Sequence, residues 1–329
     1  MPIVRLSRLQ QRVDIFVRAQ VDMRKLVFVL LVALSVVGVT AQTERRVAAN
    51  SGANARVTSG NDTTVQTVEL DSKLLRRKVW FTVILPQHYF DRDESGRTYP
   101  VVYLLHGLDG HFDNWTGKTQ LAEDFGARNW IAVTPEGANG WYTDSASTPE
   151  DKFESYIIQE VIPEVDHRYR TIRERRGRAI AGLSMGGYGS IKFGLKYPDM
   201  FSIVGSFSGA LNAALPSAKE IAPTWKLLID SLASVYGPDD SNTRKQNDIF
   251  RLLLEVPPEK LKSLPFVYLD CGTEDGLLKT NRDFDVLLVD RKLPHEFREL
   301  PGKHEWAYWN RQVQEFLRVA ARIGFGMSQ

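Results

Sequence analysis

Residues 178–196 read RAIAGLSMGGYGSIKFGLK and contain the pattern Gly-x-Ser-x-Gly centred on Ser184. Residues 178–181 have the short apolar character of a buried strand, whereas residues 188–196 have the character of a helix. A serine in this pattern, between a strand and a helix, is typical of a nucleophile held on a sharp turn. The segment therefore predicts a strand–turn–helix unit that carries a reactive serine.

The glycines on either side of the serine have a steric purpose, because a Cβ atom at Gly182 or Gly186 would crowd the turn. We expect this turn to lift Ser184 Oγ above the sheet. The Met185 amide then lies at the start of the helix, where it can stabilise a developing oxyanion. The alternative is a glycine-rich packing turn with an inert serine, and the flanking strand and helix favour the reactive interpretation.

The rest of the chain repeats the alternation of strand-like and helix-like segments. Such alternation predicts an α/β fold, with a mostly parallel central sheet and helices on both faces. We expect one domain at residues 67–329 and a kink or boundary at Pro163 in the helical segment 151–167. Further strands are expected at 78–85, 101–105, 130–134, 202–205, 266–270 and 296–300, and a closing helix at about 305–323.

Residues 211–264 form the exception to this alternation. The stretch is long, prone to helix and interrupted by several prolines. Long connections of this kind in α/β proteins commonly carry function. We expect an insertion above the sheet that forms part of a substrate pocket.

A serine nucleophile needs an acid and a base, in the chain order serine, acid, histidine. The strand 266–270 leads into a loop that contains Asp275, where a carboxylate can face the serine. Asp270 and Glu274 are its competitors, the first still on the strand and the second one residue away. His304 follows the last predicted strand and opens the closing helix, which is the place for the base.

The loop after the strand 101–105 offers the second oxyanion donor, the Leu108 amide. His106 in this loop is expected to be structural, holding the loop by hydrogen bonds. The spacing of His106, Asp109, His111 and Asp113 matches no metal-ligand motif, so we expect no metal there. Acyl transfer through a serine, an acid and a histidine needs no cofactor, so none is expected.

Aromatic residues gather in two places on the expected catalytic side. Trp141 and Tyr142 lie in the loop after the strand 130–134, and we expect them to line the substrate pocket. The aromatic residues after His304 are expected to pack in the core beneath the last helix.

Composition excludes several classes of protein. With 43% apolar and 25% charged residues, the chain is globular and neither disordered, collagenous nor coiled coil. Cys271 is the single cysteine, which excludes an intrachain disulfide and a multi-cysteine metal cluster. Residues 1–41 carry six basic and two acidic residues, so the remainder has a net charge of −2 and gives no support to a nucleic-acid partner. The sequence carries no signal for an oligomeric state.

The excess of positive charge belongs to a leader. Met23-Arg24-Lys25 precedes the uncharged run 26–39, and Val39-Thr40-Ala41 follows the pattern of a cleavage site. We expect a signal peptide that starts at Met23 and is cleaved after Ala41, with export to the periplasm or the medium. The run has 14 residues, and a membrane span needs about 20, so no stable membrane anchor is expected. Residues 42–66 are expected to form a flexible tether.

Four motifs in this order resemble the esterase D-like branch of the α/β-hydrolases. They are Leu105-His106-Gly107, residues 182–187 (GLSMGG), residues 270–275 (DCGTED) and residues 301–306 (PGKHEW). The branch includes S-formylglutathione hydrolases, feruloyl and acetyl-xylan esterases, tributyrin-type esterases and mycolyltransferases. The similarity covers most of residues 68–317. Because formylglutathione hydrolysis is cytosolic, an exported chain does not suit that activity.

The resemblance implies an α/β-hydrolase fold and a serine carboxylesterase that works through an acyl-enzyme. It implies Ser184 as nucleophile, Asp275 as orienting acid and His304 as base, with the backbone amides of Leu108 and Met185 as oxyanion donors. The expected substrates are small-molecule or carbohydrate-linked esters, including feruloyl esters. Two alternatives remain open, which are an exported acyltransferase on the same triad and a catalytically dead ligand-binding module.

Overall fold

The computed structural model describes residues 56–58, 64–215 and 224–327. The predicted leader, residues 1–41, and residues 42–55 and 59–63 of the predicted tether lie outside these described residues. Among the described residues, no helix has the length and apolar character needed to cross a membrane.

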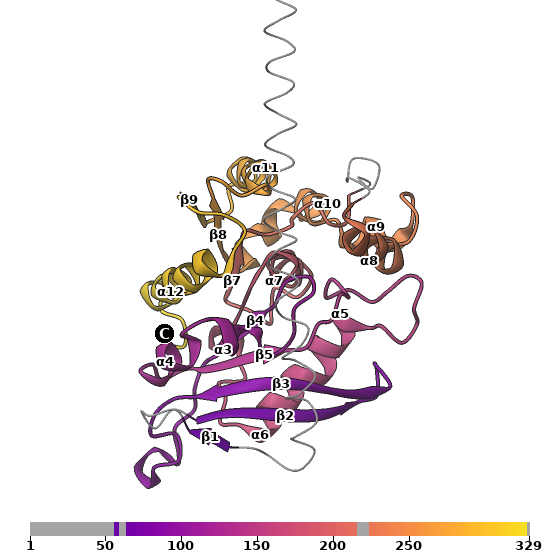
Figure 1. Cartoon of the computed structure of the whole chain (residues 1–329). Coiled ribbons are helices and arrows are strands. Elements are labelled where there is room, and N and C mark those ends of the chain that lie inside the picture. Colours follow the sequence, from indigo (N-terminus) through magenta and orange to yellow (C-terminus); the bar gives the residue numbers. More distant parts are fainter. Residues whose placement is uncertain (1–55, 59–63, 216–223, 328–329) are drawn as a thin grey trace, which may run out of the picture. The chain divides into compact units, whose positions relative to one another are not determined.

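Nine strands of the described chain form one sheet in the order β1-β2-β3-β5-β4-β6-β7-β8-β9 (Figure 1). Strands β1, β2, β3 and β5 pair antiparallel with one another in turn, whereas β5, β4, β6, β7, β8 and β9 are parallel. The prediction of a mostly parallel sheet is therefore confirmed. The strands are β1 (Arg56–Thr58), β2 (Thr64–Ser72), β3 (Arg77–Leu85), β4 (Val101–Leu105), β5 (Ile131–Pro135), β6 (Arg178–Leu183), β7 (Ile203–Phe207), β8 (Phe266–Gly272) and β9 (His295–Leu300).

Helices cover both faces of the sheet, as predicted. Side chains alternate along each strand, so Val101, Tyr103 and Leu105 of β4 join one apolar core and Val102 and Leu104 join the other. Helices α5, α6, α7 and α11 contribute to the first core, and α3, α4 and α12 to the second. The helices are α3 (Asn114–Lys118), α4 (Leu121–Gly126), α5 (Phe153–Tyr156), α6 (Ile162–Arg168), α7 (Met185–Lys196), α8 (Lys226–Tyr236), α9 (Asn242–Asn247), α10 (Ile249–Glu255), α11 (Leu278–Asp290) and α12 (Trp306–Arg322).

The sheet extends further towards the N-terminus than we predicted. Residues 56–58 and 64–66, assigned to the tether, lie in β1 and β2, which pair with each other. Strand β2 buries Thr64, Val68 and Ser72 at every fourth position and is otherwise more exposed. A hairpin at the edge of a sheet can hold this many polar residues because one face meets solvent. The tether prediction is therefore wrong for these residues.

The helical segment 151–167 contains the irregularity that Pro163 predicted. A π-helical turn, Ile157–Val161, separates α5 from α6, and Pro163 lies in the first turn of α6. The backbone is helical at Tyr156 and at Ile162, so Pro163 lies inside a continuous helical segment. Proline lacks the amide hydrogen that a regular helix uses, and the irregular turn lies directly before it.

The stretch between β7 and β8 is helical, as expected for the insertion at 211–264. It holds α8, α9, α10 and the 3-10 turn Pro258–Ser263. Tyr188 of α7 donates a hydrogen bond of 2.7 Å from its hydroxyl to the carbonyl of Asn247 in α9. The amide of Ala146 donates to the carbonyl of Val235 in α8 at 2.8 Å. The insertion therefore packs on the helix that follows Ser184 and on the loop after β5.

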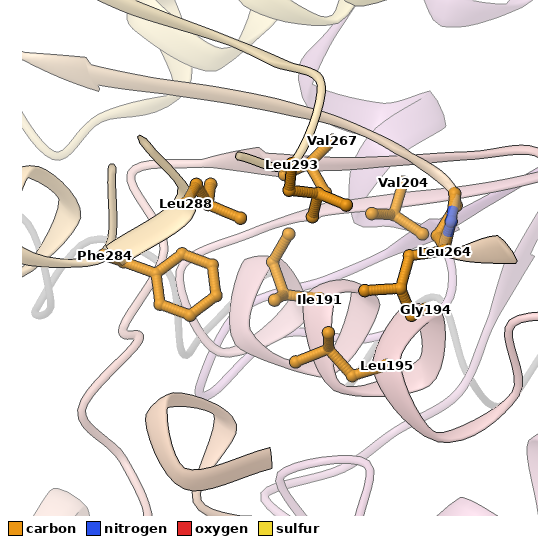
Figure 2. Close-up of a pocket in the computed structure, with 10 residues that line it drawn as sticks. Ile191, Gly194, Leu195, Val204, Leu264, Val267, Phe284, Leu288 and Leu293 are labelled. Atoms are coloured by element: carbon orange, nitrogen blue, oxygen red, sulfur yellow. The ribbon is translucent and has the colours of Figure 1, made fainter. Parts of the chain in front are cut away.

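Helices α7 and α11 pack against β7 and β8 around a cavity of about 10 Å³ (Figure 2). Ile191 and Leu195 of α7 face Phe284 and Leu288 of α11 across it, with Val204 of β7 beside them. Its lining is almost entirely apolar, so no polar partner is available to hold a water there. This packing fixes α7, and with it the turn that carries Ser184.

Candidate active site

Ser184 lies between the end of β6 and the start of α7 with φ 53° and ψ −116°. A Cβ atom at Gly182 would lie 2.5 Å from the carbonyl carbon of Gly186, and a Cβ atom at Gly186 would lie 2.5 Å from the carbonyl oxygen of Leu105. Both distances are far inside van der Waals contact. The two glycines are therefore needed at this turn for the steric reason that the motif predicts.

The structure brings Ser184, Asp275 and His304 together. His304 Nε2 lies 3.0 Å from Ser184 Oγ, and His304 Nδ1 lies 2.9 Å from Asp275 Oδ2. Asp275 follows β8 by three residues and His304 lies in the loop that leads into α12. The carboxyl ends of parallel strands meet at one edge of a sheet, which is why loops distant in sequence converge here.

Asp275 is a buried carboxylate with a donor on each oxygen. Its Oδ1 accepts the Leu277 amide at 2.9 Å, and its Oδ2 faces His304. Burial by itself raises the pKa of Asp275, but the hydrogen bond and charge interaction with His304 outweigh burial and lower it. The carboxyl is therefore ionised at neutral pH.

The two competitors for the acid position have other surroundings. Glu274 is exposed and lies 3.7 Å from the ammonium group of Lys303. Asp270 is fully buried, and burial raises the pKa of its carboxyl well above the usual range. Neither forms a hydrogen bond with His304 in the described part of the chain.

The imidazole of His304 rests edge-on against Trp309, with ring centroids 4.9 Å apart. Tyr308 and Trp309 are buried beneath the first turn of α12. The prediction that the aromatic residues after His304 pack in the core is confirmed for Tyr308 and Trp309, whereas Trp306 is only partly buried. The packing of Trp309 limits the positions that the His304 ring can take.

The loop after β4 passes beside Ser184. A Cβ atom at Gly107 would lie 3.4 Å from Ser184 Cβ and 2.6 Å from Leu183 Cδ1. Leu108 is the next residue, and Met185 is the first residue of α7. Across the described residues, neither amide donates a hydrogen bond to another protein group, so both remain available to an oxyanion.

His106 holds this loop, as predicted. It is buried, its Nδ1 lies 2.8 Å from the carbonyl oxygen of Gly107, and its Nε2 accepts the Gly137 amide at 2.9 Å. A carbonyl can only accept and an amide can only donate, so these two neighbours place the ring proton on Nδ1. Both nitrogens are thereby used on backbone groups.

Glu136 is a residue of this site that the sequence analysis missed. It follows β5, and its Oε1 accepts the Ala138 amide at 2.7 Å, while its Oε2 lies 3.3 Å from both the Phe112 amide and His111 Nδ1. Burial by itself raises the pKa of Glu136, but its interactions with the neighbouring histidines and amides outweigh burial and hold it well below the usual range. Glu136 thus connects the loop after β4 to the loop after β5. The available signal was a carboxylate directly after a buried strand.

Trp141 and Tyr142 lie differently from the expectation that they line the pocket. Both are buried, with 2% and 0% of their surface exposed. Trp141 Nε1 donates to Ser231 Oγ at 3.0 Å, and the Tyr142 hydroxyl donates to the carbonyl of His106 at 3.1 Å. Positive φ angles of 51° and 49° turn this part of the loop into the protein. The structure gives both side chains a packing role.

A buried lysine joins the same loop to α7. Lys192 Nζ donates to the carbonyl of Tyr142 at 2.5 Å and to Thr143 Oγ1 at 2.6 Å, and it lies 2.9 Å from Glu154 Oε2. Burial by itself raises the pKa of Glu154, but the charges of Lys192 and Lys196 outweigh burial and lower it to about 2.

No group of three or more His, Cys, Asp or Glu side chains in the described ranges is arranged to hold a metal ion. The site itself brings together a hydroxyl, an imidazole, a carboxylate and two backbone amides that donate to no other group of the described chain.

Comparisons with known proteins give the family. A family model described as "Putative esterase" matches residues 72–319, which is more than half of the chain. An acetyl esterase of Caldicellulosiruptor saccharolyticus is 29% identical over 269 residues, which cover 79% of this chain and 98% of the relative.

Solved structures agree with that result. A ferulic acid esterase has a TM-score of 0.66 and 28% identity, covering 80% of this chain and 99% of the other. The fluorophosphonate-binding serine hydrolase F of Staphylococcus aureus has a TM-score of 0.70 and 26% identity, covering 78% and 98%. S-formylglutathione hydrolases and mycolyltransferases are also among the similar proteins. The chain belongs to the esterase family of this model, in the esterase D-like branch of the α/β-hydrolases, and is a carboxylic ester hydrolase.

Proposed function

We propose that this chain is a serine carboxylesterase in which Ser184, His304 and Asp275 act as nucleophile, base and orienting acid. The observation that supports the proposal most directly is the position of His304, whose two ring nitrogens face Ser184 Oγ and the Asp275 carboxylate at 3.0 and 2.9 Å. This is the geometry that activates a serine hydroxyl.

In the first step Ser184 Oγ attacks the ester carbonyl carbon while His304 Nε2 takes the hydroxyl proton. The ionised Asp275 accepts a hydrogen bond from the Nδ1–H of His304, which keeps Nε2 free to act as a base and stabilises the imidazolium that forms. The Leu108 and Met185 amides donate to the oxyanion, and each such donor lowers the barrier by about 3–4 kcal/mol.

In the second step the tetrahedral species collapses. The bond to the alcohol oxygen breaks, and the alcohol leaves with the proton from His304, so an acyl-Ser184 ester remains. A water molecule then attacks the carbonyl carbon of this ester, and His304 takes a proton from that water. The acid departs and the proton returns to Ser184 Oγ. No metal or organic cofactor enters either step.

For substrates we propose small-molecule esters and acyl esters of carbohydrates, acetyl or feruloyl. The names of two similar proteins, an acetyl esterase and a ferulic acid esterase, support this class. We also propose export of the chain, on the leader pattern described above, and the 224–264 helices as part of the substrate-binding surface.

The test is hydrolysis of 4-nitrophenyl esters from acetate to decanoate, together with methyl ferulate, by the full chain and its Ser184→Ala variant. We expect turnover by the full chain and its loss in a variant with an unchanged far-UV spectrum. Full activity of the folded variant would refute the assignment of Ser184 as the nucleophile. Product analysis with and without a sugar acceptor separates hydrolysis from acyl transfer, and the absence of any turnover favours the binding-module alternative.

A further inference from the structure

The loop after β5 lies against the loop that carries the Leu108 amide, and hydrogen bonds join the two loops on both sides of that amide. The Tyr142 hydroxyl donates to the His106 carbonyl, two residues before Leu108, at 3.1 Å. The Asp109 amide, one residue after Leu108, donates to Asn139 Oδ1 at 2.8 Å. The peptide groups before and after the one that contains the Leu108 amide are therefore both held by the loop after β5.

The Tyr142 side chain is itself fixed to the helix that begins just after Ser184. A Cβ atom at Gly189 of α7 would lie 2.7 Å from Tyr142 Cδ2, and a Cβ atom at Gly137 would lie 2.5 Å from Tyr142 Cε1. Both distances are far inside van der Waals contact, so the ring is wedged between two stretches of backbone. The Tyr142 carbonyl also accepts Lys192 Nζ of α7 at 2.5 Å. Tyr142 thus joins α7 to the loop of the Leu108 amide.

The backbone of the loop after β5 is strained where it makes these contacts. Ala138, Trp141 and Tyr142 have φ angles of 42°, 51° and 49°, in the left-handed region that non-glycine residues rarely adopt. Such strain persists where surrounding contacts fix the backbone, and it clusters at functional sites. At Tyr142 the strained backbone accompanies an inward side chain, whose hydroxyl reaches the His106 carbonyl.

The Tyr142 hydroxyl is suited to hold one acceptor permanently. The side chain is 0% exposed, so water does not compete for the bond. Burial raises the pKa of Tyr142 well above its usual range, so the hydroxyl keeps its proton and donates throughout the neutral range of pH. His106 is buried as well, and its carbonyl loses this donor if the hydroxyl is removed. A buried carbonyl without its donor is costly, which favours a shift of the peptide group.

We propose that Tyr142 and Asn139 are positioning residues that hold the Leu108 amide where it can donate to the oxyanion. The inference rests on the proposed function, in which this amide is one of the two oxyanion donors. Both residues act through the peptide groups next to Leu108. A donor lowers the barrier only when it is aimed at the place where the oxyanion forms, so a small displacement of the loop costs rate.

The experiment compares the full chain with Tyr142→Phe, which keeps the ring and removes only the hydroxyl. With 4-nitrophenyl acetate we expect kcat and kcat/KM to fall together by about tenfold, because the lost interaction exists only in the transition state. This is part of the roughly 10²–10³-fold loss that follows removal of a whole oxyanion donor.

An alkyl trifluoromethyl ketone tests the oxyanion donor directly. Ser184 Oγ adds to the carbonyl carbon of the ketone, His304 takes the hydroxyl proton, and the carbonyl oxygen becomes an oxyanion. We expect the inhibition constant to rise in Tyr142→Phe by about the same factor as kcat/KM falls, since the adduct resembles the transition state. A side chain that serves stability alone would leave this constant unchanged in the folded variant.

Tyr169→Phe is the matched control. Tyr169 is also buried, and its hydroxyl donates to Gln66 Oε1 at 2.8 Å on β2, at the antiparallel edge of the sheet rather than beside β6. We expect wild-type turnover and a wild-type inhibition constant in this variant. Asn139→Ala tests the other side of Leu108. Asn139 is partly exposed, so this variant should fold, with kcat/KM and the inhibition constant changed by about threefold.

Thermal unfolding shows which variants are folded at the assay temperature, and three outcomes then overturn the inference. They are wild-type kcat/KM in folded Tyr142→Phe, a fall of kcat/KM with an unchanged inhibition constant, and an equal loss of turnover in Tyr169→Phe. If Tyr142→Phe does not fold, Asn139→Ala decides, and wild-type kinetics in that variant overturn the inference.

Labelling of Ser184 by a fluorophosphonate probe distinguishes this failure from that of the proposed function. Turnover and labelling that need Ser184 but ignore Tyr142 and Asn139 overturn the inference alone. The absence of both turnover and labelling in the wild type overturns the inference and the proposed function together.

Discussion

In the described site two carboxylates lie beside histidines, the buried Asp275 and the half-buried Glu136, and their surroundings differ. His304 turns one nitrogen to Asp275 and the other to the hydroxyl of Ser184. His106, beside Glu136, uses both nitrogens on backbone groups of neighbouring loops. A carboxylate and an imidazole thus form the proposed reactive unit in one place and a clamp between loops in the other, according to what the second nitrogen faces.

The two histidines also differ in their exposure to solvent. The side chain of His304 is 38% exposed and that of His106 is 1% exposed. A general base must reach a substrate and a water molecule, whereas a clamp works best where water cannot compete for its hydrogen bonds. Exposure and the second partner together separate the two roles.

The largest contrast is expected when His304 and His106 are each replaced by glutamine. His304→Gln should lower kcat by at least about 10³-fold, because the base is lost, with little change in the free energy of unfolding. His106→Gln should instead lower the free energy of unfolding by about 1–3 kcal/mol, since buried backbone groups lose their partners, with a smaller loss of kcat. Turnover of 4-nitrophenyl acetate and urea denaturation measure the two quantities. Equal loss of turnover in both variants at unchanged stability would refute the clamp role.

The carboxylates provide the next largest contrast. Asp275→Asn should lower kcat by about 10²–10⁴-fold at similar KM, because the amide no longer fixes the His304 tautomer. Glu136→Gln should lower kcat by only about tenfold, through a loosened loop that carries the Leu108 amide. Initial rates over a range of substrate concentrations give kcat and KM separately. A Glu136→Gln variant as inactive as Asp275→Asn would place Glu136 in the reaction itself.

Glu154 extends the comparison to a buried carboxylate that faces lysines. The charges of Lys192 and Lys196 overcome the effect of burial and lower its pKa from 4.5 to about 2. The folded pKa is below the unfolded one, so this stabilisation is complete above pH 4.5 and is lost as the pH falls towards about 2. We expect it to be of the order of 3 kcal/mol.

The check is the free energy of unfolding of the wild type and of Glu154→Gln between pH 6 and pH 3. The wild type should lose more stability over this range than the variant, which has no carboxyl to protonate at this position. Parallel curves for the two proteins would show that Glu154 is not stabilised by its lysines.

The smallest effect is expected at Trp141. Trp141→Phe removes the hydrogen bond to Ser231 and should cost about 0.5–1.5 kcal/mol of stability, with kcat/KM for 4-nitrophenyl acetate within about twofold of the wild type. Thermal unfolding and initial rates test both statements. A strong rise in KM at unchanged stability would indicate that Trp141 lines the substrate pocket.

Some parts of this arrangement could be predicted from the sequence because local chemistry determines them. The turn at Ser184 requires glycine at positions 182 and 186 whatever packs around it, so the motif identifies the turn. The positions of Asp275 and His304 after parallel strands follow from the same logic, since the strand ends meet at one edge.

Other parts depend on contacts that no local pattern records. The role of Glu136 arises only when two loops meet, and the inward position of Trp141 and Tyr142 depends on their positive φ angles. The polar residues at the start of β2 have the composition of a tether, and only their pairing with β3 shows that they form a strand. Each of these features needs the three-dimensional arrangement.

The insertion between β7 and β8 has a consequence for how this enzyme can change. The two strands pair in continuous register from Ile203 with Phe266 to Phe207 with Asp270, although α8, α9 and α10 lie between them in the chain. The register of the two strands therefore does not depend on the length of the connection between them. If its helices form part of the substrate-binding surface, as we propose, a new substrate preference can evolve or be engineered in their exposed residues, provided that the buried residues that pack on α7 are kept.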